Sequence, residues 1–257
     1  MPEFRFKSGG IHLFAVENGD GESIVMLHGG MADHRTTLPF VASLGTRYRV
    51  ITPDLRGSGK SWSASPLTFD QLADDVIALL DHVGARRAVV GGVSTGSGVA
   101  LRFALRHPDR ILALVLVTPV YAGGDHGYTQ QQRTAFARMD SVASRAADEG
   151  VQVLRSLYAN LPPAIQERAV AMLERFDAAS VVASSHFVAS GAQPFAAADD
   201  LRSLEVPTLL IRGNDDIHPA EISDLYAENI PNCLVVRAAV ADVSQAIGAF
   251  CDQCAKP

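Results

Sequence analysis

The sequence predicts an α/β fold, a doubly wound, mostly parallel sheet with an inserted helical lid. Short apolar, β-branched runs recur along the chain without clean alternation of polar and apolar residues. Such runs are typical of strands that are buried on both faces of a parallel sheet. Segments with helical periodicity separate the runs, and alternating strands and helices are the pattern of a doubly wound sheet.

The expected strands follow one another along the chain. Residues 4–7 and 11–16 flank Ser8-Gly9-Gly10 and predict an N-terminal hairpin. Further strands are expected at 24–27, 48–52, 88–93, 111–117, 208–211 and 234–236. The apolar face of a helix between them is marked by Leu72, Val76, Leu79, Leu80 and Val83.

One long stretch breaks the alternation. From residue 129 to 190 every apolar period is helical, with a break at Leu161-Pro162-Pro163. We expect this region, within limits of about 121–200, to be a lid inserted into a single domain that spans 1–257, since a chain of this length can bury one core. Its apolar side chains are expected to form mainly the core of the lid. Periodicity does not show which of them face a substrate.

Composition and charge restrict the partners. The net charge of −6 argues against a polyanion, because phosphate binding needs clustered Lys and Arg. The apolar run 111–117 is far too short to cross a membrane, and the N-terminus shows no secretory signal. Three cysteines, Cys233, Cys251 and Cys254, do not describe a disulfide framework, and the last two suit a helix core better than a redox pair. We expect a cytoplasmic protein with a small-molecule substrate, without nucleic acid or membrane partners, and leave a homo-oligomer open.

The strongest candidate for chemistry is a glycine-rich turn around Ser94. The segment Gly92-Val93-Ser94-Thr95-Gly96 follows an expected strand and opens an expected helix. A sharp strand-to-helix turn tolerates only small neighbours and exposes the serine Oγ above the sheet. The N-terminus of the helix favours developing negative charge. The pattern predicts that Ser94 is a nucleophile.

A second glycine pair supplies candidate oxyanion donors. His28-Gly29-Gly30-Met31 follows the expected strand 24–27. The N–H of Gly30, with Met31 as the alternative, is expected to join the N–H of Thr95 in an oxyanion hole. His28 is interpreted as a structural turn residue rather than a base.

With these motifs, the chain resembles the α/β-hydrolase superfamily, in the branch of lidded esterases, enol-lactonases, C–C hydrolases and cofactor-free haloperoxidase-like enzymes. The loop 53–61, PDLRGSGKS, and the strand and turn 206–216, VPTLLIRGNDD, are also similar to that branch. The resemblance implies that Asp216 is the acid of a catalytic triad, with Asp215 as the alternative. It implies a scaffold role for Asp54 and Arg56.

The sequence departs from the family at the third triad residue. The order Ser, acid, His places the histidine after the last strand, but no histidine follows His218. Residues 237–243 contain no Gly, Pro or Asn to turn the chain, which predicts a break or a strained join there. Three interpretations stay open. A loop of the native protein is missing from this sequence, the loop is truly deleted, or His126, His186 or His218 replaces the base.

The residues together predict a serine hydrolase for a small, mostly apolar ester, lactone or related acyl substrate. Ser94 attacks, Gly30 and Thr95 hold the oxyanion, and Asp216 orients the base. We expect no metal and no cofactor, because the chain lacks HExxH, paired CxxC and a ribose-binding GxGxxG motif. The alternatives are a non-catalytic, receptor-like ligand binder without the histidine, or a lyase that uses the same pocket.

Overall fold

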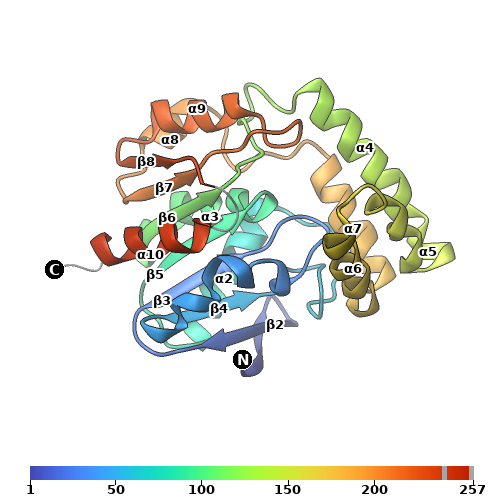
Figure 1. Ribbon diagram of the computed structural model, residues 1–257, viewed down its shortest axis with the longest axis horizontal. Helices are drawn as coiled ribbons and strands as arrows, with labels where there is room; N and C mark the ends of the chain where they lie inside the picture. The colour runs from blue at the N-terminus through green and yellow to red at the C-terminus, as the bar shows by residue number, and fades with distance from the viewer. Residues whose placement is uncertain (239–241, 255–257) are drawn as a thin grey trace.

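The computed structural model describes residues 1–238 and 242–254 of the 257-residue chain. Eight strands form one sheet in the order β1-β2-β4-β3-β5-β6-β7-β8 (Figure 1). The strands β1 and β2 are antiparallel to their neighbours, and the remaining pairs are parallel. Their bounds are β1 Glu3–Ser8, β2 Ile11–Asn18, β3 Ser23–Leu27, β4 Arg49–Pro53, β5 Ala88–Val93, β6 Ile111–Val117, β7 Thr208–Ile211 and β8 Cys233–Val236. The predicted fold class is confirmed.

Helices cover both faces of the sheet (Figure 1). One face packs against α2 and α3, and the other against α1 and α10. The α-helices are α1 Leu38–Val41, α2 Phe69–His82, α3 Thr95–Arg106, α4 Gln130–Ser144, α5 Ala146–Glu149, α6 Pro163–Met172, α7 Ala178–Ala189, α8 Ala198–Arg202, α9 Ala220–Asn229 and α10 Val243–Cys254. The 3-10 helices are η1 His34–Thr36, η2 Ala42–Thr46, η3 Pro108–Arg110, η4 Val151–Leu157 and η5 Leu173–Arg175.

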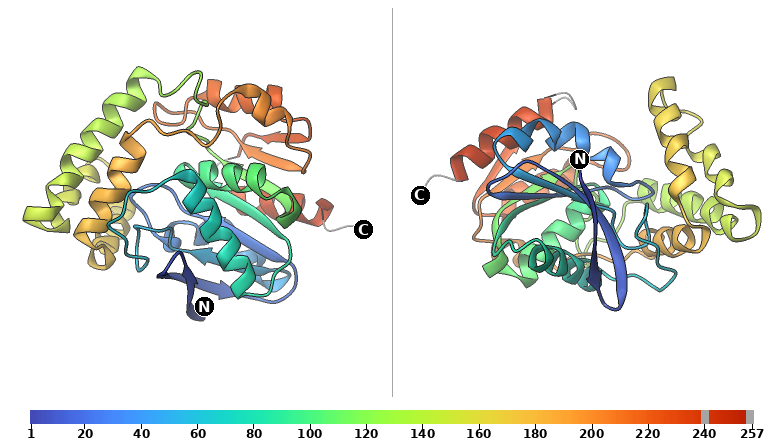
Figure 2. Two further views of the ribbon diagram at one scale, coloured as in Figure 1. Left: turned by 180° about the vertical axis from the view of Figure 1, so that it is seen from behind. Right: turned by 90° about the horizontal axis from the view of Figure 1, so that it is seen from below.

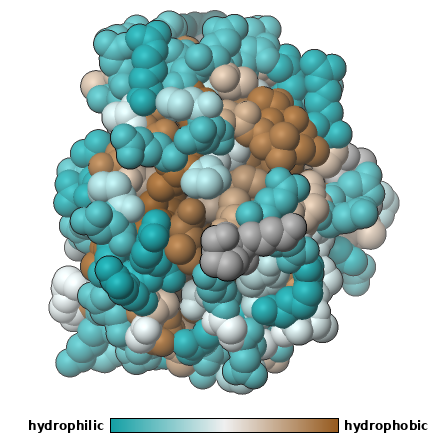
Figure 3. Space-filling model, turned by 90° about the vertical axis from the view of Figure 1, so that its left-hand side faces the viewer, coloured by the Kyte–Doolittle hydropathy of each residue, from teal (hydrophilic) through white to brown (hydrophobic). Residues whose placement is uncertain are grey.

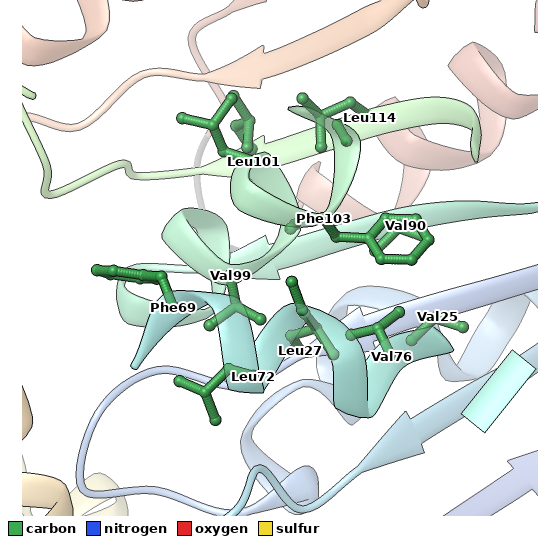
Figure 4. Close-up of a cluster of buried hydrophobic side chains, with 14 of the residues drawn as sticks. Val25, Leu27, Phe69, Leu72, Val76, Val90, Val99, Leu101, Phe103 and Leu114 are labelled. Atoms are coloured by element: carbon green, nitrogen blue, oxygen red, sulfur yellow. The ribbon is translucent and has the colours of Figure 1, made fainter. Parts of the chain in front are cut away.

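The parallel strands are apolar on both faces because both faces are buried. In β3, Val25 and Leu27 belong to the cluster under α2 and α3, whereas Ile24 and Met26 belong to the cluster under α1 and α10. Figure 4 shows the first cluster, with side chains of α2 and α3 packed against those of β3, β5 and β6. This double burial explains why these strands lack polar alternation in the sequence.

A run of helices, α4 to α8, connects β6 to β7, and we refer to residues 130–202 as the helical insertion. Its helices α4 to α7 lie to one side of the sheet (Figures 1 and 2), whereas α8 lies beside α9. Part of its apolar surface forms a separate cluster that includes Leu154, Tyr158 and Met172. Phe136 and Phe187 instead join the main core. The helical stretch therefore lies where the sequence placed it, and its role as a lid stays a prediction.

The far edge of the sheet is β8, and it exposes Leu234 and Val235 at 46% and 40% of their surface. Figure 3 shows the side of the molecule that lies at the left of Figure 1, where apolar areas interrupt the polar surface. The predicted break or strained join at 237–243 includes residues 239–241, which lie outside the described residues. In the part of the chain that is described, no helix is both long and apolar enough to span a membrane.

The three cysteines are free thiols. Cys251 is buried in the cluster under α10, and Cys254 packs against it. Burial raises the pKa of the Cys251 thiol to about 12. A thiol with a raised pKa is a poor nucleophile and a poor redox partner, which agrees with a packing role for this pair.

Candidate active site

Ser94 occupies a strained turn between β5 and α3. Its backbone has φ 53° and ψ −115°, a region that L-residues rarely adopt. The turn is tight because small residues flank it: a Cβ on Gly92 would lie 2.0 Å from the carbonyl oxygen of Gly96. Ser97 Oγ donates to the Ser94 carbonyl at 2.6 Å and secures the first turn of α3. The local geometry has the form expected for a nucleophile elbow.

The loop after β3 lies against this turn. A Cβ on Gly29 would lie 3.4 Å from Ser94 Cβ, and one on Gly30 would lie 3.1 Å from Thr95 Oγ1. Met31 has φ 53° and packs into the cluster of the helical insertion, where the Tyr158 hydroxyl donates to its carbonyl at 3.2 Å. The two backbones from which oxyanion donors are expected are thus adjacent.

A histidine from another loop completes the arrangement. His218, between β7 and α9, places Nε2 at 2.9 Å from Ser94 Oγ. Its Nδ1 lies 3.0 Å from both carboxylate oxygens of Asp215. A proton on Nδ1 suits this environment: Nδ1–H donates to Asp215, and Nε2 accepts from the Ser94 hydroxyl. The structure thus brings together a serine, an imidazole and a carboxylate in the order of a catalytic triad.

Asp215, the alternative in the sequence, takes the place that was expected for Asp216. Asp216 is exposed and lines an open polar hollow together with Asn214 and Glu221. Asp215 Oδ1 also accepts from the backbone N–H groups of Ile217 and His218, at 2.9 and 2.8 Å. These bonds turn its carboxylate back toward the imidazole. The expectation for Asp216 is corrected on this point: the carboxylate that meets the imidazole is one residue earlier.

The charge of Asp215 is stabilised in this position. Burial raises the pKa of its carboxyl, but the hydrogen bond and charge of His218 and the backbone N–H groups outweigh that effect. The net result is a pKa below the ordinary value for Asp. The side chain is 62% exposed, whereas His218 is 19% exposed, so the dyad is open to solvent on the acid side.

The other candidate histidines have different partners. His186 lies on α7 and contacts Asp140 at 2.7 Å. His28 is buried, accepts from the Leu55 N–H through Nε2 at 2.9 Å, and has Nδ1 at 2.7 Å from the Gly29 carbonyl oxygen. Burial lowers the pKa of His28, which keeps it neutral and fits a structural role in the turn. His126 lies in the loop between β6 and α4.

One group of side chains has the composition of a metal site. Asp33, His34 and Asp54 are buried, with candidate ligand atoms within 4.8 Å of one another. Their oxygens are used within the protein: Asp33 binds Arg35, and Asp54 accepts from the N–H of His34 at 2.8 Å and lies 2.7 Å from its Nδ1. These contacts support a scaffold role for the group, as expected for Asp54.

Arg56 has a similar role. Its guanidinium forms a buried pair with Asp75 of α2, at 2.5 and 2.9 Å, and also donates to the Ser8 carbonyl at 3.2 Å. It therefore ties the loop after β4 to α2 and to β1. The expected scaffold interpretation of this loop agrees with these contacts.

The sequence pattern missed the pairing of Asp215 with His218. A local signal was present: an aspartate three residues before a histidine can accept from the intervening N–H groups and so face the ring. No such signal indicated that this loop lies close to Ser94. His218 and Ser94 are 124 positions apart in the sequence, and they meet because β5, β6 and β7 are neighbours in the sheet.

Comparisons with known proteins agree with the fold. A family model described as alpha/beta hydrolase fold matches residues 22–242. The 2-hydroxymuconate semialdehyde hydrolase of Pseudomonas putida is 30% identical over 233 residues, 84% of this chain and 78% of that protein. RutD of Azorhizobium caulinodans, named as a candidate carbamate hydrolase, is 28% identical over 252 residues, 94% of this chain and 90% of that protein.

A solved structure with the same architecture is that of a thermophilic esterase from Thermogutta terrifontis, with malate bound. It has a TM-score of 0.77 and 25% identity, and the match covers 98% of this chain and 97% of the esterase. The fold agreement extends over nearly the whole length of both proteins, and the family model covers most of this chain. The chain therefore belongs to the α/β-hydrolase family of enzymes.

Proposed function

We propose that this protein is a serine hydrolase in which Ser94, His218 and Asp215 form the catalytic triad. The observation that carries the proposal is the chain of contacts from Ser94 Oγ to His218 Nε2 at 2.9 Å and from His218 Nδ1 to Asp215 at 3.0 Å. It favours the interpretation in which a histidine from elsewhere replaces the family's usual base. The alternative function, a non-catalytic ligand binder, depended on the absence of a catalytic histidine. His218 is a candidate for that histidine.

The proposed reaction begins with attack of Ser94 Oγ on the substrate carbonyl carbon. His218 Nε2 accepts the hydroxyl proton as the new C–O bond forms, and the Asp215 carboxylate stabilises the resulting imidazolium. The N–H groups of Gly30 and Thr95 hold the oxyanion. His218 then protonates the leaving group, and an acyl group stays on Ser94. Water, deprotonated by His218, releases the acid product and restores the serine.

The substrate is proposed to be a small, mostly apolar ester, lactone or related acyl compound. An apolar side chain of the helical insertion borders the elbow: Val188 Cγ2 would lie 3.5 Å from a Cβ on Gly30. Such a border favours an apolar acyl group. The esterase and the semialdehyde hydrolase among the relatives suggest a test panel of short p-nitrophenyl esters, lactones and 2-hydroxymuconate semialdehyde. A cytoplasmic location stays part of the proposal.

Covalent labelling tests the nucleophile. A fluorophosphonate should modify Ser94 alone, as mapped by peptide mass spectrometry, and Ser94→Ala should abolish both labelling and turnover of p-nitrophenyl butyrate. Ser156→Ala is the control, because Ser156 is an exposed serine of η4 whose Oγ bonds to the Val153 carbonyl. Adduct on another serine, or full turnover by the Ser94 variant, would contradict the proposal.

A further inference from the structure

Gln132 is a fully buried amide in the first turn of α4, the first helix of the helical insertion. Its Nε2 donates to the carbonyl of Val120 at 2.9 Å and to the carbonyl of Ile217 at 2.8 Å. Its Oε1 accepts from the N–H of Thr129 at 2.9 Å, as part of a capping box. One side chain thus joins the loop after β6, the start of the insertion and the loop that carries His218.

The contact with Ile217 acts on the peptide unit that leads into His218. The carbonyl of Ile217 and the N–H of His218 belong to the same peptide group. Gln132 holds its oxygen at 2.8 Å, and Asp215 Oδ1 holds its N–H, also at 2.8 Å. Because a peptide group is planar, two bonds on opposite sides fix its orientation. The Cα–Cβ direction of His218 is thereby set from both sides.

In the described residues, the loop that carries His218 has few other hydrogen bonds that restrain its backbone. Asp215 and Asp216 are exposed, and within that part of the chain the turn is otherwise held by three bonds. The N–H of Ile217 donates to Asp215 Oδ1 at 2.9 Å, the N–H of Asp215 to the His218 carbonyl at 3.3 Å, and the N–H of Gly213 to Ser223 Oγ at 3.1 Å. An apolar residue in place of Gln132 would leave two carbonyl oxygens without their donor. Exposed loops need such restraints to hold a base within a fraction of an ångström of its nucleophile.

We propose that Gln132 is a positioning residue for the base, and that it makes the position of His218 depend on the helical insertion. The inference rests on the proposed function of His218 as the base. The side-chain amide of Gln132 bonds to backbone groups, and its effect on the base passes through the 217–218 peptide. Movement of α4 would therefore be transmitted to the base rather than to Ser94, whose turn is built from β5 and α3.

The principal test replaces Gln132 by glutamate, which has the same size but loses both amide donors, and by methionine. We expect kcat for p-nitrophenyl butyrate to fall about 10²-fold with little change in KM, and the rate of fluorophosphonate labelling of Ser94 to fall in parallel. Gln130→Met is the matched control: Gln130 is exposed in the same turn, and among the described residues its side chain bonds to Arg133 and Thr134, both in α4. It should behave like the unsubstituted protein.

A double-mutant cycle with His218→Ala separates positioning from general damage to the fold. If Gln132 acts through the base, Gln132→Glu should lower kcat in the native background and add nothing to the residual rate of His218→Ala. An equal loss in both backgrounds, or native kcat in the Gln132 variants, overturns the inference. Native kcat in His218→Ala instead overturns the proposed function itself. If the methionine variant does not fold at the assay temperature, as judged by its thermal melt, the glutamate variant and its cycle decide the question.

Discussion

Ser94 and His218 meet in one site, but two different kinds of structure hold them. Ser94 lies on a turn whose shape is set by backbone packing, with Gly92 and Gly96 too close to their neighbours to accept a side chain. His218 lies on a partly exposed loop whose shape is set by side chains, those of Asp215 and Gln132. The nucleophile side should therefore be rigid and intolerant of added volume. The base side should be sensitive to single hydrogen-bonding groups and tolerant of change elsewhere.

The largest effect is expected from the base. His218→Ala should lower kcat by about 10⁶-fold, because loss of the base of a serine triad leaves only oxyanion and binding contributions. His186→Ala should leave kcat nearly unchanged, because His186 pairs with Asp140 on the helical insertion. Steady-state turnover of a p-nitrophenyl ester measures both. A large loss of kcat in His186→Ala with little loss in His218→Ala would place the base on α7 rather than on the loop after β7.

The next largest effect on kcat is expected at the two neighbouring carboxylates, Asp215 and Asp216. Asp215→Asn should lower kcat by about 10⁴-fold, since the amide favours the wrong tautomer of the imidazole. Asp216→Asn should change kcat by less than about threefold, because Asp216 is exposed and the carboxylate that contacts His218 is that of Asp215. Kinetics of the two single variants provide the measurement. A large loss of kcat in Asp216→Asn with nearly native kcat in Asp215→Asn would show that Asp216, as the family spacing implies, is the triad acid.

The elbow should respond to added volume rather than to lost hydrogen bonds. A Cβ at Gly96 would lie 2.5 Å from the carbonyl oxygens of Leu27 and His28, so Gly96→Ala should lower the free energy of unfolding by about 3 kcal/mol or more. Gly127→Ala is the control: φ there is +62° with open space around the Cβ, and the cost should be about 1–2 kcal/mol. Urea unfolding at neutral pH compares them. Equal costs would mean that the close packing at the elbow is not what makes it rigid.

The buried His28, in the loop after β3 that lies against the Ser94 turn, should make the free energy of unfolding depend on pH. Its folded pKa is lowered by burial, so the unfolded chain binds more protons as the pH falls below the ordinary histidine value of about 6.5. Stability contributed by neutral His28 is present above that pH. It should decrease by up to about 1.4 kcal/mol per pH unit below it, until the folded pKa is reached. Urea unfolding of the native protein and of His28→Gln between pH 7.5 and 5 tests this, and equal slopes would contradict it.

The smallest effect is expected at Tyr226, on the helix that follows the base loop. Its hydroxyl is buried and, within the described parts of the chain, has no hydrogen-bond partner. Removal of an unpartnered buried hydroxyl is neutral or stabilising, so Tyr226→Phe should change the free energy of unfolding by 0 to about +1 kcal/mol. The kcat should be unchanged, as thermal melts and ester assays can verify. A clear loss of kcat would mean that restraint of the base loop extends into α9.

The sequence by itself determined the sheet and the turn around Ser94. Strands buried on both faces must be apolar throughout, so their limits were readable, and the predicted ranges 88–93, 111–117 and 208–211 coincide with β5, β6 and β7. The turn around Ser94 is equally local, because its small residues are neighbours in the chain. Local steric rules act over a few residues and leave a direct mark on the sequence.

The tertiary structure alone decided which groups meet Ser94. His218 lies 124 residues away from it, and the sequence offered three histidines as replacements without a means of ranking their distances. The choice between Asp215 and Asp216 depended on two backbone N–H groups that orient one carboxylate. Gln132 fits a local capping-box pattern with Thr129, but that pattern gave no sign of its bond to Ile217, which depends on the approach of α4 to a loop 85 residues further along the chain. Contacts of this kind depend on how packed elements are placed, and no short pattern of residue types encodes that placement.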